Sequence, residues 1–168
     1  MLKEKINSQI KDIRNIVLFK ALHYKGHALE KHVLTDEQLF GVLAKKRRPI
    51  DPDDIIMVTR FNDAETAVNL IADTLLKNIN EIEHWLLTDT DCDYVAYAFF
   101  DFATGDGLAK NTDCSHTIPV HGMCVVVRKD YSCICNSFVV VTAYPVSSPD
   151  DTDIVYECID EYISRKDA

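Results

Sequence analysis

The sequence predicts an α+β fold in which N-terminal helices are followed by a curved antiparallel sheet. Apolar residues recur at helical spacing up to Leu86, whereas three segments beyond Trp85 are rich in aromatic and β-branched residues. Clusters of Gly, Asp and Ser separate those three segments, as in a meander of antiparallel strands. The chain shows no repeat and no long linker, so we expect a single domain.

The first twenty-odd residues are expected to form one amphipathic helix that ends near Gly26. A second helix is predicted from Thr35, because Thr35 and Gln38 have the spacing of a capping box. This helix should stop before Pro49, since the residue preceding a proline is disfavoured in the α region. The apolar stripe of the first helix comprises Leu2, Ile6, Ile10, Ile13 and Val17.

A strand is predicted at residues 55–59, and Asn62 is then expected to cap one long helix that runs to Leu86. The antiparallel meander follows. Its strands are expected at residues 94–102, 123–128 and 138–144. Residues 153–163 return to helical spacing and predict a C-terminal helix.

Composition sets the scale of the protein. The chain has 168 residues and is 47% apolar, which is enough for one domain with a sizeable core. No apolar run reaches the length of a membrane span, and the N-terminus lacks the apolar core of a signal peptide, so we expect a soluble protein. The predicted organisation is an N-terminal helix over residues 1–22, a core over 23–146 and a C-terminal helix over 147–168.

The six cysteines are expected to be mostly buried thiols. Cys133 and Cys135, with Cys114, His116 and His121 nearby in sequence, suggest a zinc site. Their spacing differs from that of the usual paired ligands, so no metal is predicted.

Residues 137–146 are the most informative segment of the chain. Four consecutive apolar residues, three of them valine, predict a central strand. Pro145 is expected to end its ladder, because proline has no N–H to donate. Thr142 and Tyr144 have the same parity, so their hydroxyls should emerge together on one face of the sheet. The alternative is that two polar side chains simply face water.

Several short motifs occur in one order along the chain. They comprise a Gly-His…His-Val start, a Thr-x-Phe-x-Asp…Thr-Ala helix start, a Trp-Leu helix end, a Gly-rich turn, a Val-rich strand and a Thr-Ala-Tyr-Pro strand. Here these motifs are Gly26 to Val33, Thr59 to Ala67, Trp85-Leu86, Gly105 to Gly107, Gly122 to Arg128 and Thr142 to Pro145. The ordered set resembles the RNase A-like toxin domains at the C-termini of bacterial contact-dependent inhibition (CdiA) proteins.

This resemblance implies an RNase A-like fold and a ribonuclease toxin that cleaves RNA without a metal or cofactor. RNA would be the substrate and a cognate immunity protein the partner, whereas DNA and membranes would not be targets. The domain would act in the cytoplasm of a target cell after delivery as part of a larger secreted protein.

Cleavage of RNA by its own 2′-hydroxyl needs a base for that proton, an acid for the 5′-oxygen and donors for the charge on the phosphorane. Histidine titrates near neutral pH and can fill either proton-transfer role. The predicted proton carrier is His32, which the resemblance favours over His27. Tyr144 is predicted as a donor or second proton carrier, and Thr142 as a contact to phosphate or to a base edge.

Positive charge is concentrated at one end of the sequence. Residues 1–48 contain 11 Lys/Arg against 5 Asp/Glu, whereas residues 49–168 contain 7 against 22, which gives the chain a net charge of −9. A local basic cleft on an acidic body should therefore bind RNA weakly and with marked salt sensitivity.

The resemblance also implies an active-site arginine in the second helix, where the aligned position here is Val42. Arg47 and Arg48 are predicted to act catalytically in its place, although this basic run is alternatively only the solvated end of a helix. Either His116 or His121 could be a second proton carrier. The predicted substrate-binding residues are His27, Lys31, Lys45, Lys46 and His121.

A function of another class also fits the acidic balance and the missing arginine. The chain would then be a catalytically inactive RNase-like domain, or an acidic immunity-type module that binds a basic partner. This alternative predicts no turnover. The presence of His32, Thr142 and Tyr144 together favours the enzyme.

Overall fold

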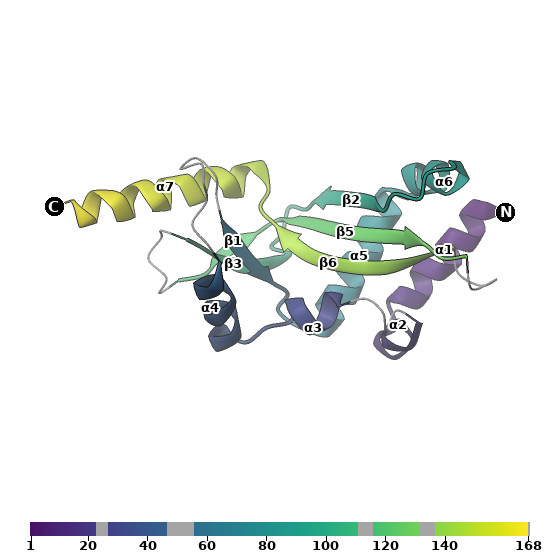
Figure 1. The fold of residues 1–168 in the computed structure, drawn as a ribbon, viewed down its shortest axis with the longest axis horizontal. Helices are drawn as coiled ribbons and strands as arrows, with labels where there is room; N and C mark the ends of the chain where they lie inside the picture. Colours follow the sequence, from purple (N-terminus) through teal and green to yellow (C-terminus); the bar gives the residue numbers. More distant parts are fainter. Residues whose placement is uncertain (23–26, 47–55, 111–115, 132–136, 168) are drawn as a thin grey trace.

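The computed structural model describes residues 1–22, 27–46, 56–110, 116–131 and 137–167, and it confirms the predicted α+β class (Figure 1). None of the helices in these ranges is long and apolar enough to cross a membrane. In chain order the elements are α1 (Leu2–Ile13), α2 (Ile16–Leu22), α3 (Ala28–His32), α4 (Asp36–Lys45), β1 (Met57–Arg60), α5 (Ala64–Lys77), α6 (Ile79–Leu87), β2 (Tyr94–Phe99), β3 (Gly105–Ala109), β4 (Ile118–Val120), β5 (Gly122–Lys129), β6 (Phe138–Val146) and α7 (Pro149–Lys166).

The larger of two sheets has the antiparallel strand order β2-β5-β6, and each of these strands was predicted. They do not form a simple meander, because β3 and β4 lie between β2 and β5 in the chain and belong to a second sheet that was not predicted. Helix α5 packs against β2 and β5, and α1 and α6 lie on the same side (Figure 1). Because side chains alternate along a strand, Ala96 of β2 and Val125 of β5 face these helices and are fully buried. The main core therefore lies between this sheet and the three helices.

The smaller sheet has the antiparallel order β1-β3-β4 and is covered by α4. Gly105 and Gly107, which the motif comparison assigned to a turn, lie instead within strand β3. Glycine is required there, because a Cβ at Gly105 would lie 2.1 Å from the Arg60 carbonyl oxygen. A small second core, made of Leu39, Leu43, Val58 and Leu108, holds α4 to this sheet.

The first twenty-odd residues form two helices rather than the single expected one. The side-chain oxygen of Asn15 accepts hydrogen bonds from the N–H groups of Val17 and Leu18, at 3.0 and 3.2 Å. Asn15 therefore acts as an N-cap that starts α2 in a new direction. Val17, expected in the apolar stripe, is consequently 75% exposed.

The long helix expected after Asn62 also differs in the structure. Asp63, not Asn62, is its cap, because the Asp63 side chain accepts from the Thr66 N–H at 2.7 Å. The helix then breaks at Asn78 into α5 and α6. The Asn78 side-chain amide donates to the carbonyls of Thr74 and Tyr97, so side-chain bonds to the sheet stabilise the break.

Strand β6 contains a β-bulge that the sequence did not reveal. Val126 pairs with Thr142 and Val127 with Val140, so Val141 is an extra residue in the ladder. Before the bulge the even-numbered residues Phe138 and Val140 face the core, whereas beyond it the odd-numbered Ala143 does. The expectation that Pro145 ends the ladder was wrong: Pro145 pairs with Met123, and β6 continues to Val146. A proline is tolerated because β6 is the edge strand of its sheet.

Helix α7 begins at Pro149, before the predicted start at residue 153. Ser148 and Asp151 cap it reciprocally: the Ser148 N–H donates to the Asp151 carboxylate at 2.8 Å, and the Asp151 N–H donates to the Ser148 hydroxyl at 3.2 Å. The termini of the chain lie at opposite ends of the molecule (Figure 1).

Candidate active site

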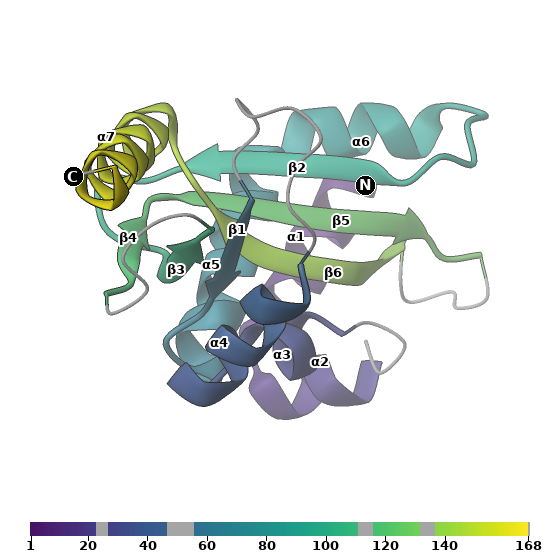
Figure 2. The same cartoon turned by 60° about the vertical axis from the view of Figure 1, so that its left-hand side comes forward.

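The short helix α3 lies where the two sheets meet (Figure 2). At its start, the His27 N–H donates to the Val141 carbonyl of β6 at 3.2 Å. At its end, the His32 carbonyl accepts from the Phe61 N–H, just beyond β1, at 2.6 Å. The Thr59 hydroxyl of β1 in turn donates to the Pro145 carbonyl of β6. These bonds hold His32 between the two strands.

The structure brings His32 and Tyr144 together although they are 112 positions apart in the sequence. Their ring centroids are 5.2 Å apart, with the ring planes tilted by 33°. Thr142 has the predicted parity with Tyr144, since both follow the bulge on β6. The Thr142 hydroxyl oxygen is buried and has no hydrogen-bond partner within the part of the chain that the structure describes.

His32 and Tyr144 line a cleft of about 320 Å³ between α3, α4, β1 and β6. Two lysines, Lys31 and Lys46, contribute positive charge to its walls. Val42, at the position where the resemblance implies an arginine, also lines the cleft. The remaining lining residues are Leu34, Met57, Val58 and Thr59.

Burial, and then the neighbouring positive charges of His27 and Lys31, together lower the pKa of His32 to about 4. The ring's hydrogen bond to the backbone of Thr59 acts in the opposite direction. His32 is therefore neutral near pH 7. One nitrogen of a neutral imidazole is a donor and the other an acceptor, so the nitrogen that does not bond Thr59 can accept a proton.

The pKa of Tyr144 is shifted in the opposite direction, upward. A hydrogen bond with Cys124, together with burial, raises the pKa of Tyr144 to about 12, so its hydroxyl keeps its proton. Cys124 is a buried free thiol that faces Tyr144 across β5 and β6. It also forms a hydrogen bond with Tyr97, which is its partner on β2. Three side chains in register across the sheet thus hold the Tyr144 hydroxyl in its protonated form.

The cations near the cleft differ in their availability. Arg60 is engaged: its guanidinium contacts the Asp106 carboxylate at 2.7 and 3.2 Å and Asp36 at 2.6 Å. Lys46, the C-cap of α4 and four residues after Val42, lines the cleft. Lys45 is exposed and does not line the cleft. Arg47 and Arg48 lie outside the described residues.

The other predicted contacts are not gathered in the cleft. His27 directly precedes α3, near enough to affect the charge of His32, but does not line the cavity. His121 lies between β4 and β5, where its Nδ1 pairs with the buried carboxylate of Asp151 at 2.6 Å. This pair ties α7 to the small sheet. Cys114, Cys133 and Cys135, of the suggested zinc site, also fall outside the described residues.

Sequence reasoning missed several residues of this site. Leu34, Met57 and Val58 carry no chemical signal and line the cleft through their place on β1 and before α4. Thr59 was visible only as part of a helix-start motif. Cys124 and Tyr97 act through strand register, which no local pattern reports.

The arrangement has a counterpart among solved structures. The fold is similar to that of the "CdiA-CT/CdiI complex from Y. kristensenii", with a TM-score of 0.60 and 16% sequence identity. The match covers 72% of this chain and 99% of the other. At this identity the likeness defines the fold, that of a CdiA-CT domain.

The family follows from the sequence. The model of the bacterial CdiA-CT RNase A domain matches residues 26–145, and the chain belongs to this family of ribonuclease toxins of contact-dependent inhibition. No curated protein sequence gives a significant match.

Proposed function

We propose that this chain is a metal-independent endoribonuclease domain that cleaves RNA through the 2′-hydroxyl of the substrate itself. The observation that carries the proposal is the contact between a neutral histidine and a protonated tyrosine in a cleft lined by lysines. His32 and Tyr144 have shifted pKa values in opposite directions, which is the pattern expected of a base and an acid.

His32 is the proposed general base. Its free ring nitrogen takes the proton of the 2′-hydroxyl while the 2′-oxygen forms a bond to phosphorus. The hydrogen bond to the Thr59 backbone fixes the orientation of the ring. This bond also stabilises the imidazolium that forms, because it favours the charged state.

Tyr144 is the proposed general acid. As the bond between phosphorus and the 5′-oxygen breaks, the Tyr144 hydroxyl donates its proton to that oxygen, and water later restores it. A leaving alkoxide is a stronger base than a phenolate whose pKa is about 12, so this transfer is downhill. The products are a 2′,3′-cyclic phosphate and a free 5′-hydroxyl.

Lys46 and Lys31 are the proposed electrostatic groups for the charge on the phosphorane. Lys46 acts in place of the arginine that the resemblance implies at position 42, where this chain has valine. An ammonium is a point charge and cannot bind a phosphate in bidentate fashion, so this clamp is weaker than a guanidinium. Thr142 does not line the cleft and its hydroxyl oxygen is buried, so a contact between Thr142 and substrate would require a local rearrangement that exposes this oxygen.

A cognate immunity protein is the proposed partner, and the cytoplasm of a target cell the proposed place of action. The similar structure, described as a complex of CdiA-CT with CdiI, supports such a partner. A second candidate function rests on Val42: no arginine is among the described residues that line the cleft, which favours a catalytically inactive RNase-like domain or an acidic module that binds a basic partner.

The decisive experiment is incubation of the purified chain with total RNA in EDTA, followed by analysis of the new ends. We expect cleavage that leaves 2′,3′-cyclic phosphates. An oligonucleotide with one ribonucleotide among deoxynucleotides should be cut only after the ribose, and all-deoxy DNA should remain intact. Cleavage that requires a divalent metal would contradict the mechanism, and binding without cleavage would favour the second candidate.

A further inference from the structure

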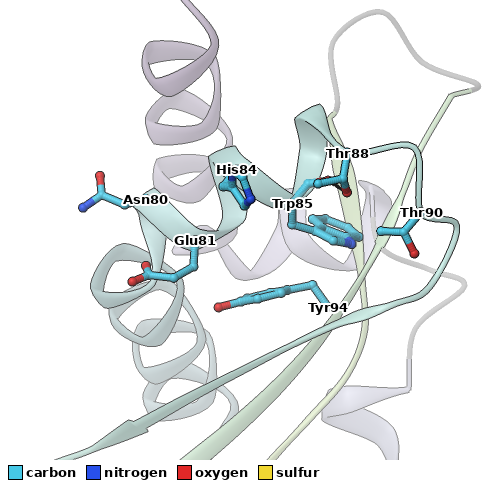
Figure 3. Close-up of a pocket in the computed structure, with 7 residues that line it drawn as sticks. All are labelled: Asn80, Glu81, His84, Trp85, Thr88, Thr90 and Tyr94. Carbon is cyan, nitrogen blue, oxygen red and sulfur yellow. Dashed lines mark hydrogen bonds between the residues drawn. The ribbon is translucent and has the colours of Figure 1, made fainter.

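A second cavity, of about 480 Å³, opens between helix α6 and the start of strand β2. Figure 3 shows its two aromatic walls, Trp85 from the helix and Tyr94 from the strand, with Glu81 on the side of the Tyr94 hydroxyl. We call this cavity the Trp85 pocket. The residues that line it are Asn80, Glu81, His84, Trp85, Thr88, Thr90 and Tyr94.

The aromatic walls of the Trp85 pocket are fixed in place. The Trp85 indole N–H donates to the Cys92 carbonyl at 3.0 Å, and the Tyr94 hydroxyl donates to the Asn78 side chain at 3.3 Å. The two rings also contact each other, with centroids 5.8 Å apart. A ligand would therefore meet walls that need no rearrangement, which reduces the entropic cost of binding.

The segment that forms this pocket is acidic, because residues 80–94 contain five Asp/Glu and no Lys/Arg. Two cations from other elements contact it: Arg128 pairs with Asp93, and the Lys3 ammonium donates to the Asn80 side chain at 2.6 Å. Glu81 is exposed, and within the described ranges its carboxylate has neither a hydrogen bond nor an ion pair. Burial, and then the charge of Glu81, raise the pKa of Tyr94, so the carboxylate acts on the aromatic wall. Beside Glu81 an anion such as RNA phosphate is therefore disfavoured, and a cation is favoured.

The molecule itself shows that this indole attracts cations. The Lys129 ammonium lies 5.4 Å from the centre of the Trp85 ring and donates to the Thr88 carbonyl. Lys129 does not line the pocket. A planar guanidinium combines stacking on an aromatic wall with a charged bond to a carboxylate, which an ammonium does less well.

We propose that the Trp85 pocket binds an arginine side chain of a protein partner, with its guanidinium against the aromatic wall and beside Glu81. This site is distinct from the His32 cleft. Tyr94 shares its strand face with the buried Ala96, toward the helices, whereas Tyr144 lies on the other face of the sheet. The inference therefore does not depend on ribonuclease activity.

The test uses Trp85, which is the single tryptophan of the chain. N-acetyl-arginine amide is titrated into the intact protein while the fluorescence of Trp85 and its indole N–H resonance are followed. We expect a saturable change with the arginine amide. The affinity for the lysine amide should be at least about 5-fold lower. The affinity for the citrulline amide, which has the shape of arginine without its charge, should be lower still. Equal binding of citrulline and arginine, or no saturable change, would overturn the proposal.

Two matched variants test the role of Glu81. Glu81→Gln should weaken arginine binding about 2- to 5-fold, whereas Glu83→Gln, which removes the same charge from the same helix, should leave it unchanged. Equal effects would mean that net charge alone attracts the ligand, which contradicts a specific pocket. Displacement of the arginine amide by an RNA oligonucleotide would likewise assign the pocket to another ligand and overturn the proposal.

Discussion

The His32 cleft and the Trp85 pocket lie on opposite faces of one sheet and differ in almost every physical respect. The cleft is lined by two lysines and a histidine, and its tyrosine is held by a buried thiol. The pocket is lined by a carboxylate and two aromatic rings, and its tyrosine is held by an asparagine amide. The first arrangement suits an anion and the second a cation.

This difference shows why a net charge of −9 says little about the ligand of either site. The lysines of the cleft come from the basic first 48 residues, and the carboxylates near the pocket from the acidic remainder. Because charges in water are screened within about 8 Å at physiological salt, each site responds mainly to its own neighbours. The following substitutions test whether the two sites are chemically separate.

The largest effect is expected for His32→Ala. Loss of the general base should reduce kcat/KM for RNA cleavage by about 10² to 10⁴. The measurement is single-turnover cleavage of a short RNA in EDTA. His84→Ala, which removes a histidine from the Trp85 pocket, is the control and should leave the rate unchanged. Comparable losses in both variants would show that the two sites are not separate.

Tyr144→Phe is expected to reduce cleavage about 100-fold, because the acid for the 5′-oxygen is removed. A substrate whose leaving group is a nitrophenolate needs no protonation, so this variant should cleave it at nearly the wild-type rate. Tyr94→Phe is the corresponding change in the pocket and should affect neither substrate. If Tyr144→Phe slows both substrates equally, Tyr144 positions the phosphate and is not the acid.

Lys46→Ala is expected to lower kcat/KM about 10-fold, since one charge beside the phosphorane is lost. Lys45→Ala removes an equal charge from the preceding residue, outside the cleft, and should change the rate less than about 2-fold. Lys46→Arg should retain most of the activity. The measurement is cleavage at several salt concentrations, and equal losses for Lys46→Ala and Lys45→Ala would refute the clamp.

The smallest effect concerns stability in acid. The folded protein holds the pKa of His32 at about 4, below the ordinary 6.5, so the unfolded state binds more protons between these values. Stability should therefore fall as the pH drops from about 6.5 to 4. His32→Gln should remove part of this slope, visible as a difference of a few degrees in the pH dependence of Tm. An unchanged slope in His32→Gln would contradict this origin of the acid sensitivity.

Local patterns in the sequence were sufficient to predict structural features whose signals lie within one helical turn. The capping box of Thr35 and Gln38 is present in the structure as predicted, with both of its hydrogen bonds. The helix breaks at Asn15 and Asn78 were not predicted, because the apolar spacing continues across them. At Asn78 the break depends on bonds to β2, which lies 19 residues further on at Tyr97.

The site was predictable only where a motif marked it. His32 and Tyr144 were singled out from the sequence, and the structure places their rings in contact, but the roles assigned to them remain predictions. Lys46 could not be separated from Lys45, Arg47 and Arg48 in a run of four cations, because the distinction depends on which helix face meets the cleft. Cys124 was read as a buried thiol, and its contact with Tyr144 follows only from the pairing of β5 with β6.

The extra residue in β6 makes the chemistry of this domain sensitive to strand length. If Val141 were deleted and the ladder closed, the residues beyond it would exchange sides, which would carry Tyr144 toward the helices and Ala143 toward the cleft. A conservative substitution in this strand can be accommodated, but a change of one residue in its length cannot. Homologues that keep the tyrosine on the cleft face must therefore keep the parity of the residue count between the positions of Val140 and Tyr144, whatever their sequence identity.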